Sequence, residues 1–119
     1  MRVITLLLAF FITQCWAAEP PKIVFISGEY EYHSKETLSS YAQELERQFN
    51  VQTTLLARPE DETKHTIAGL DTLKDADLVV LFVRRMTLPE EDLAPIKKYL
   101  DAGKPLVALR TASHAFENW

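Results

Sequence analysis

The apolar residues of the chain fall into short runs separated by longer segments with helical spacing. The run LVVLFV is the most hydrophobic stretch beyond the first 18 residues, and it predicts a central strand because strands covered on both faces are continuously apolar. The run LVAL predicts a second buried strand by the same rule. KIVFISG predicts a strand ending in a glycine that permits a tight turn or close backbone approach, and VQTTLL alternates as a more exposed strand does. The four predicted strands are 22–28, 51–56, 78–83 and 106–109.

Helical patterns lie between these strands. Ser34 can cap a first helix, whose apolar residues recur at helical spacing until Asn50 ends it. A short helix is expected within residues 67–76. Thr87 and Glu90 form a capping box in the sequence TLPEE, which predicts the start of a further helix.

Strands that alternate with helices predict an α/β fold with a parallel sheet, because right-handed crossover connections return each strand in the same direction. The expected architecture is a flavodoxin-like three-layer sheet with strand order 2-1-3-4. The chain has 119 residues, of which 47% are apolar and 25% charged, a composition suited to one globular domain. We expect this domain to cover residues 19–119.

Residues 1–18 are interpreted as a cleavable signal peptide. Arg2 provides a positive start, and residues 3–13 form an 11-residue largely apolar core. In Cys15-Trp16-Ala17, the small residues Cys15 and Ala17 lie at the positions that a signal peptidase reads. The run is shorter than the ~20 apolar residues of a membrane-spanning helix, so no stable membrane anchor is expected. A lipoprotein signal at Cys15 is disfavoured by Gln14, and the expected location is periplasmic or extracellular.

Charge and cysteine content narrow the function classes. The formal net charge of -4 becomes -5 when Arg2 leaves with the signal peptide, which argues against a nucleic-acid or anionic-membrane partner. Cys15 is the only cysteine, so the mature chain can form no disulfide and has no thiol nucleophile. With three glycines and neither a P-loop nor a GxGxxG motif, a nucleotide site is not expected.

Three segments at predicted strand ends carry a family resemblance. SGEYEYHSKETL, LVVLFVRRMTLPEE and ALRTASHAF resemble the ThuA-like (trehalose-utilisation) family, of the class I glutamine-amidotransferase-like superfamily, over residues 22–119. The resemblance implies a role in the use of trehalose-type disaccharides or oxidised (keto) sugars. It also places Arg110 where glutamine amidotransferases carry their Cys nucleophile. Arginine is no nucleophile, so thiol-dependent glutamine hydrolysis is excluded.

The candidate site lies at the carboxyl ends of the strands, where open α/β sheets form their ligand crevices. We assign His33, Arg110 and His114 the acid/base and electrostatic roles, and we expect Arg110, both histidines and one of two neighbouring arginines to line one cavity. At most one of those two arginines should face the crevice, because side chains alternate along a strand. The predicted substrate-binding residues are Glu29, Tyr32, Arg84, Arg85 and Ser113.

Several of these residues have a second interpretation. The carboxylates and imidazoles near the strand ends could bind a divalent metal, yet they follow no known ligand spacing, and a solvated acidic loop is the alternative. Tyr30 and Tyr32 could stack on a sugar ring or cover the sheet edge. Ser113 and His114 are disfavoured as nucleophile and base, because adjacent side chains usually point apart and no GxSxG motif surrounds them. Ser113 could instead cap a helix, and His65 is expected only at the surface.

Two function classes remain open. The first is an exported carbohydrate-processing enzyme acting on a small-molecule sugar, and the second is a non-catalytic sugar-binding or scaffold module. Cofactor, metal dependence and oligomeric state are not determined by the sequence. We also expect the chain to be part of a longer domain, because the run LVAL predicts a buried strand with no following element long enough to cover it.

Overall fold

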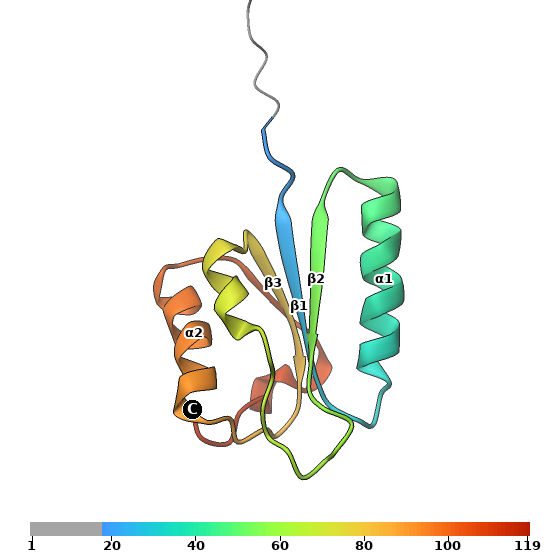
Figure 1. Cartoon of the computed structure of the whole chain (residues 1–119). Coiled ribbons are helices and arrows are strands. Elements are labelled where there is room, and N and C mark those ends of the chain that lie inside the picture. Colours follow the sequence, from blue (N-terminus) through green and yellow to red (C-terminus); the bar gives the residue numbers. More distant parts are fainter. Residues whose placement is uncertain (1–17) are drawn as a thin grey trace, which may run out of the picture.

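The computed structural model of the chain describes residues 18–119 and confirms the predicted fold class (Figure 1). Four strands form one parallel sheet in the order β2-β1-β3-β4. The predicted signal peptide lies, apart from Ala18, outside the described residues. In chain order the elements are β1 (Lys22–Gly28), α1 (Ser34–Gln48), β2 (Gln52–Ala57), the 3-10 helix η1 (Leu70–Asp75), β3 (Leu78–Val83), α2 (Glu90–Asp101), β4 (Leu106–Ala108) and the 3-10 helix η2 (Arg110–His114).

Helices cover both faces of the sheet and produce two apolar cores. α1 lies on one face, and η1 and α2 lie on the other (Figure 1). The stripe of α1 that the sequence predicted packs Leu38 and Ala42 against the inward side chains of β1 and β3. The core on that face consists of Phe25, Leu38, Ala42, Val80 and Phe82. The larger core on the other face includes Ile26, Leu73, Leu81, Met86, Leu93 and Ile96.

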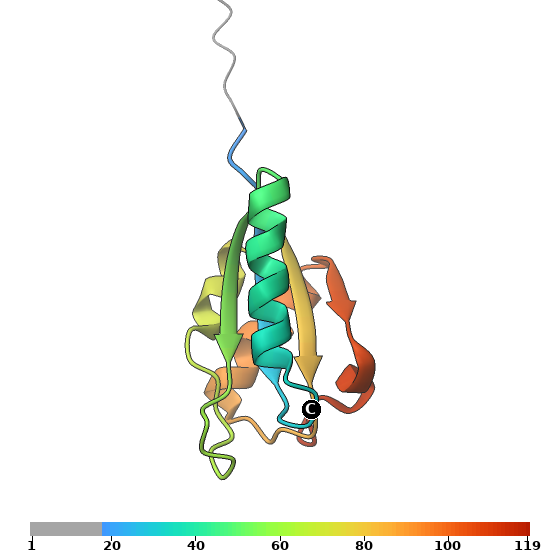
Figure 2. The same ribbon diagram turned by 90° about the vertical axis from the view of Figure 1, so that its right-hand side faces the viewer.

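β4 departs from the sequence prediction of a fully buried strand. Leu106 and Val107 are 38% and 44% exposed, and all three residues of the strand are exposed. The reason is the position of β4 at the end of the sheet, where it pairs with β3 alone and lies beside the area that α1 covers (Figure 2). Within residues 18–119 nothing pairs with its outer edge.

The residues after η2 pack against the larger core and against each other. Phe116 is partly buried against the larger core, and its ring stacks on Trp119 with centroids 5.8 Å apart. Trp119 itself is exposed. The segment also extends the pairing of β3 and β4, because the Met86 N–H donates to the Ala115 carbonyl and the Glu117 N–H donates to the Met86 carbonyl.

Two predicted helix starts are wrong in detail. α2 begins at Glu90 with Pro89 as its N-cap, and no side chain caps it, so the capping box of Thr87 does not form. The Thr87 N–H instead donates to His65 Nδ1 at 2.9 Å, which keeps Thr87 outside the helix. Ser34 is the first residue of α1 and not its cap.

Two smaller differences concern helix type and length. The short helix expected within residues 67–76 is the 3-10 helix η1. α1 ends at Gln48, and Phe49 takes the C-cap position in an extended conformation. Among the described residues, no helix has the length and apolar character that crossing a membrane requires.

Candidate functional site

Three loops at the carboxyl edge of the sheet each hold a non-glycine residue in the left-handed region. His33 after β1, Arg85 after β3 and Arg110 after β4 have φ angles of 52°, 47° and 44°. They are the only non-glycine residues with positive φ among the described residues. Left-handed backbone costs roughly 1–2 kcal/mol for a residue with a Cβ, so the surrounding structure must hold each one in place. All three are candidate site residues from the sequence.

Glu29 fixes the loop between β1 and α1. Its carboxylate is buried and accepts hydrogen bonds from the Tyr32 N–H at 2.6 Å and the Ser34 N–H at 2.8 Å. Burial alone would raise the pKa of Glu29, but the hydrogen bonds from Ser34 and from the loop N–H groups outweigh it and lower the pKa. Both carboxylate oxygens are thus occupied, and Glu29 organises the loop that carries His33.

A second contact in this loop joins two buried hydroxyl groups. Ser27 Oγ, at the end of β1, lies 2.6 Å from Ser34 Oγ in the first turn of α1. Both side chains are buried, so the Ser27 hydroxyl needs this partner, while the Ser34 side chain also hydrogen-bonds the Glu29 carboxylate. The contact explains why Ser34 lies within the helix while the carboxylate of Glu29 takes over the capping of its N–H.

Tyr32 and Arg110 bring the loops after β1 and β4 together. The Tyr32 ring is stacked on Phe82 of β3 at 6.1 Å between centroids, and the Arg110 guanidinium lies 4.0 Å from the Tyr32 ring centroid. The cation is therefore positioned by an aromatic face. The Tyr32 ring covers the sheet edge at Phe82, and the residue is 36% exposed.

The two arginines after β3 have different surroundings, but both lie beyond the end of the strand at Val83, so strand alternation does not apply to them, and neither lines the cavities of the two histidines as expected. Arg84 Nη1 lies 2.5 Å from Glu31 Oε1 in the loop after β1. Arg85 is exposed, and its N–H donates to the His114 carbonyl at 3.0 Å. The loops after β1, β3 and β4 are thus tied to one another by side-chain and backbone contacts.

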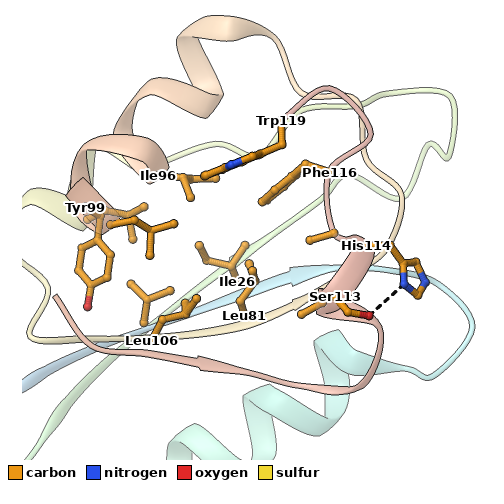
Figure 3. A pocket seen from close by; sticks show the side chains of 14 residues that line it. Ile26, Leu81, Ile96, Tyr99, Leu106, Ser113, His114, Phe116 and Trp119 are labelled. Carbon is orange, nitrogen blue, oxygen red and sulfur yellow. Dashed lines mark hydrogen bonds between the residues drawn. The ribbon is translucent and has the colours of Figure 1, made fainter. Parts of the chain in front are cut away.

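Ser113 and His114 are in contact, contrary to the expectation that adjacent side chains point apart. Ser113 Oγ lies 3.2 Å from His114 Nδ1 (Figure 3). Both residues are exposed, and Ser113 lies inside η2 and does not cap it. Within residues 18–119 no carboxylate is hydrogen-bonded to His114, so the pair lacks the acidic group that orients the base of a catalytic triad.

The candidate residues share one edge of the sheet but do not share one cavity as expected. His114 lines an apolar cavity of about 300 Å³ between the sheet, α2 and the C-terminal segment, and Figure 3 shows its ring turned away from the apolar side chains. His33 lines a different, polar cavity of about 270 Å³ beside the start of α1. Arg110, which contacts Tyr32, lines neither of these cavities.

Among the described residues, the structure shows no cluster of side chains that would support a divalent metal site. In the part of the chain that the structure describes, no group of three or more histidine, cysteine, aspartate or glutamate side chains is arranged to hold an ion. Glu29 already binds two N–H groups, and Glu31 is paired with Arg84.

Two residues with structural or functional roles were missed by sequence reasoning. His65 is not merely a surface residue, since its Nδ1 accepts the Thr87 N–H and links the loop before η1 to the loop before α2. Arg58 lies against the Tyr30 ring, 4.0 Å from the centroid, and lines the polar cavity. Neither lies in a motif, and only the partners that folding brings together distinguish them from ordinary surface residues.

Comparisons with known proteins give no relative for this chain. No family model matches it, and no curated protein and no solved structure matches it.

Proposed function

We propose that the protein binds a small carbohydrate at the carboxyl edge of its sheet and takes part in the utilisation of a trehalose-type disaccharide or keto-sugar. The observation that carries the proposal is the gathering of three left-handed residues, His33, Arg85 and Arg110, on three loops of one edge. Strained non-glycine residues cluster at ligand sites, where surrounding contacts hold them. The resemblance of these loops to the ThuA-like family supports the same assignment.

Arg110 is the centre of the proposed site. It lies two residues after the end of β4 at Ala108 and opens η2 with a left-handed backbone. This strand-turn-helix arrangement presents a side chain at the sheet edge. A guanidinium there can stabilise negative charge on a sugar oxygen but cannot attack carbon. His114, on the following helical turn, is the proposed acid/base group.

The chemistry that suits these groups is proton transfer beside a carbonyl. In a keto-sugar, the hydrogen on the carbon next to the carbonyl is the acidic one, so a histidine base and an arginine near the developing oxyanion are the required pair. The alternative is a binding or scaffold module that uses the same arginine without turnover. The exposed and unoriented state of His114 is the observation that keeps this alternative in view.

A screen of glycosides and keto-glycosides separates the two classes. Turnover is followed by loss of the carbonyl absorbance or by product chromatography, and binding is followed by the shift in thermal unfolding. We expect Arg110→Ala to abolish both signals and His114→Ala to abolish turnover alone. Arg47→Ala is the matched control, because Arg47 is an exposed arginine on α1 paired with Glu44, and it should change neither signal by more than about twofold. Stabilisation without turnover by any sugar would establish the binding module, and the absence of both signals would refute the proposed function.

A further inference from the structure

The apolar cavity between the sheet, α2 and the C-terminal segment lies apart from Arg110, the centre of the proposed edge site. Its volume is about 300 Å³. Its floor includes Ile26 of β1 and Leu81 of β3, which are 0% and 6% exposed. Its rim includes Leu106 of β4 and Trp119, which are 38% and 58% exposed. Because the floor is buried and the rim is exposed, the cavity opens to solvent and can admit a molecule.

The rim of this cavity is held in place by contacts of its own. The Phe116 ring stacks on the Trp119 ring with 5.8 Å between centroids, and Lys97 Nζ of α2 lies 5.9 Å from the Trp119 centroid. Asn118 Nδ2 donates to the Leu88 carbonyl at 2.7 Å. These contacts tie the C-terminal segment to α2 and to the loop before it. The two aromatic rings therefore stay at the rim and leave the space beneath them open (Figure 3).

The polar groups of the lining already have partners. The Tyr99 hydroxyl donates to the Pro105 carbonyl at 2.6 Å, and Ser113 Oγ lies 3.2 Å from His114 Nδ1. The described residues that line the cavity include no lysine, arginine, aspartate or glutamate. No charged side chain of this lining can therefore offset the loss of water that a charged ligand suffers on entry. The lining favours an uncharged, apolar ligand.

We propose that the apolar cavity binds a small, uncharged aromatic molecule of one or two rings. An apolar cavity of about 150 Å³ holds benzene, so roughly twice that volume suits two fused rings. The stacked rings of Phe116 and Trp119 offer apolar aromatic surface at the rim. A ligand also supplies the dispersion contacts that the atoms around a void lack. This ligand differs chemically from the sugar of the proposed function, and its site does not depend on that function.

The test measures binding of indole by isothermal titration calorimetry, with indole-3-carboxylate as the charged counterpart. Indole should bind roughly tenfold more tightly or better, because the carboxylate must lose water without gaining a partner. Leu106→Asp places a charge at the rim and should weaken indole binding roughly tenfold or more.

Val107→Asp is the matched control for Leu106→Asp. Val107 is the next residue of β4 and is 44% exposed, and it pairs in register with Val80 of the core on the α1 face. Its side chain therefore lies on the opposite face of the sheet from the cavity. Val107→Asp should change indole binding by no more than about twofold, the usual range of a surface substitution.

Direct contact is detected by NMR on protein labelled at the isoleucine δ1 methyl groups. Indole should give intermolecular NOEs to Ile26 and Ile96, which line the cavity, and none to Ile23, which packs against the core on the α1 face. This measurement uses the wild type, so it decides the matter even if circular dichroism shows that Leu106→Asp does not fold.

Three results would overturn the proposal: no binding of indole, equal binding of indole-3-carboxylate, or NOEs to Ile23 in place of Ile26 and Ile96. If a second copy of the chain covers the cavity, sedimentation will show a dimer that Leu106→Asp dissociates and that does not bind indole, which would also overturn it. Arg110→Ala separates this site from the proposed function, because it should abolish sugar binding and leave indole binding unchanged. Indole binding by a wild type that binds no sugar would refute the proposed function alone.

Discussion

The left-handed backbone at Arg110 predicts an unusual order of stabilities among its variants. A residue with a Cβ at a φ of 44° costs roughly 1–2 kcal/mol, whereas glycine adopts this conformation freely. The cation-π contact of Arg110 with Tyr32 contributes about 0.5–1 kcal/mol at an exposed site. Alanine loses the contact and keeps the strain, while glycine loses the contact and releases the strain.

Arg110→Gly should therefore be more stable than Arg110→Ala by about 1 kcal/mol, after part of the released strain is offset by the greater freedom of glycine in the unfolded chain. For a domain of this size the difference corresponds to about 4–8 °C in the unfolding midpoint. Urea and thermal unfolding, followed by circular dichroism, measure it directly. Both variants should lose sugar binding, because neither retains the guanidinium.

Arg47 provides the matched control for this pair. It lies in the last turn of α1, in right-handed helical backbone, where glycine is less favourable than alanine. Arg47→Gly should thus be less stable than Arg47→Ala, the opposite order to position 110. If Arg110→Ala equals or exceeds Arg110→Gly in stability, the backbone at residue 110 is not strained, and the argument that links strain to the site fails.

Two further predictions concern the loop after β1. Glu29→Gln should lower the free energy of unfolding by about 1–2 kcal/mol at pH 7, because two N–H groups lose a charged acceptor. The control is Glu36→Gln in the exposed first turn of α1, which should lower it by less than 1 kcal/mol. Urea unfolding measures both. Because folding lowers the pKa of Glu29, the stabilisation by its carboxylate is fully present above the ordinary value of 4.5 and is lost as the pH falls below it. A stability advantage of the wild type over Glu29→Gln that persists unchanged well below pH 4.5 would contradict this. Gly28→Ala should destabilise the protein by roughly 1–3 kcal/mol, because the new Cβ would lie 2.7 Å from Met86 Sδ. An unchanged unfolding midpoint would contradict this and show that the Met86 side chain moves aside without cost.

The sequence predicted the fold well because its signals are local and strong. β1 and β3 match the predicted residues 22–28 and 78–83, since continuous apolar runs leave little choice of boundary. β2 is shifted by one residue, and α1 begins at Ser34, one residue earlier than a cap at Ser34 predicted. The errors arise where a partner far along the chain decides the outcome, as at Thr87, whose N–H is taken by His65.

The candidate site was predicted in place but not in geometry. Strand ends alone indicated the edge at which His33, Arg110 and His114 lie. The division of the two histidines between two cavities depends on the exact paths of loops. Left-handed backbone at arginine has no sequence signal, because among residues with a Cβ that conformation favours asparagine, aspartate and histidine. The stacking of Arg58 on Tyr30 was equally invisible, since it is defined by contacts that form only in the folded chain.

The position of β1 inside the sheet has a consequence for how the chain is made. β1 is synthesised first, and the β1-α1-β2 unit can form as soon as residue 57 has left the ribosome, but the other edge of β1 pairs with β3, whose first residue is Leu78. At about 5–20 residues per second, this edge stays unpaired for roughly 1–4 s during synthesis. The nascent chain therefore exposes an apolar strand edge that the finished protein never shows, and this interval is when association with another nascent chain, or with a chaperone, competes with folding.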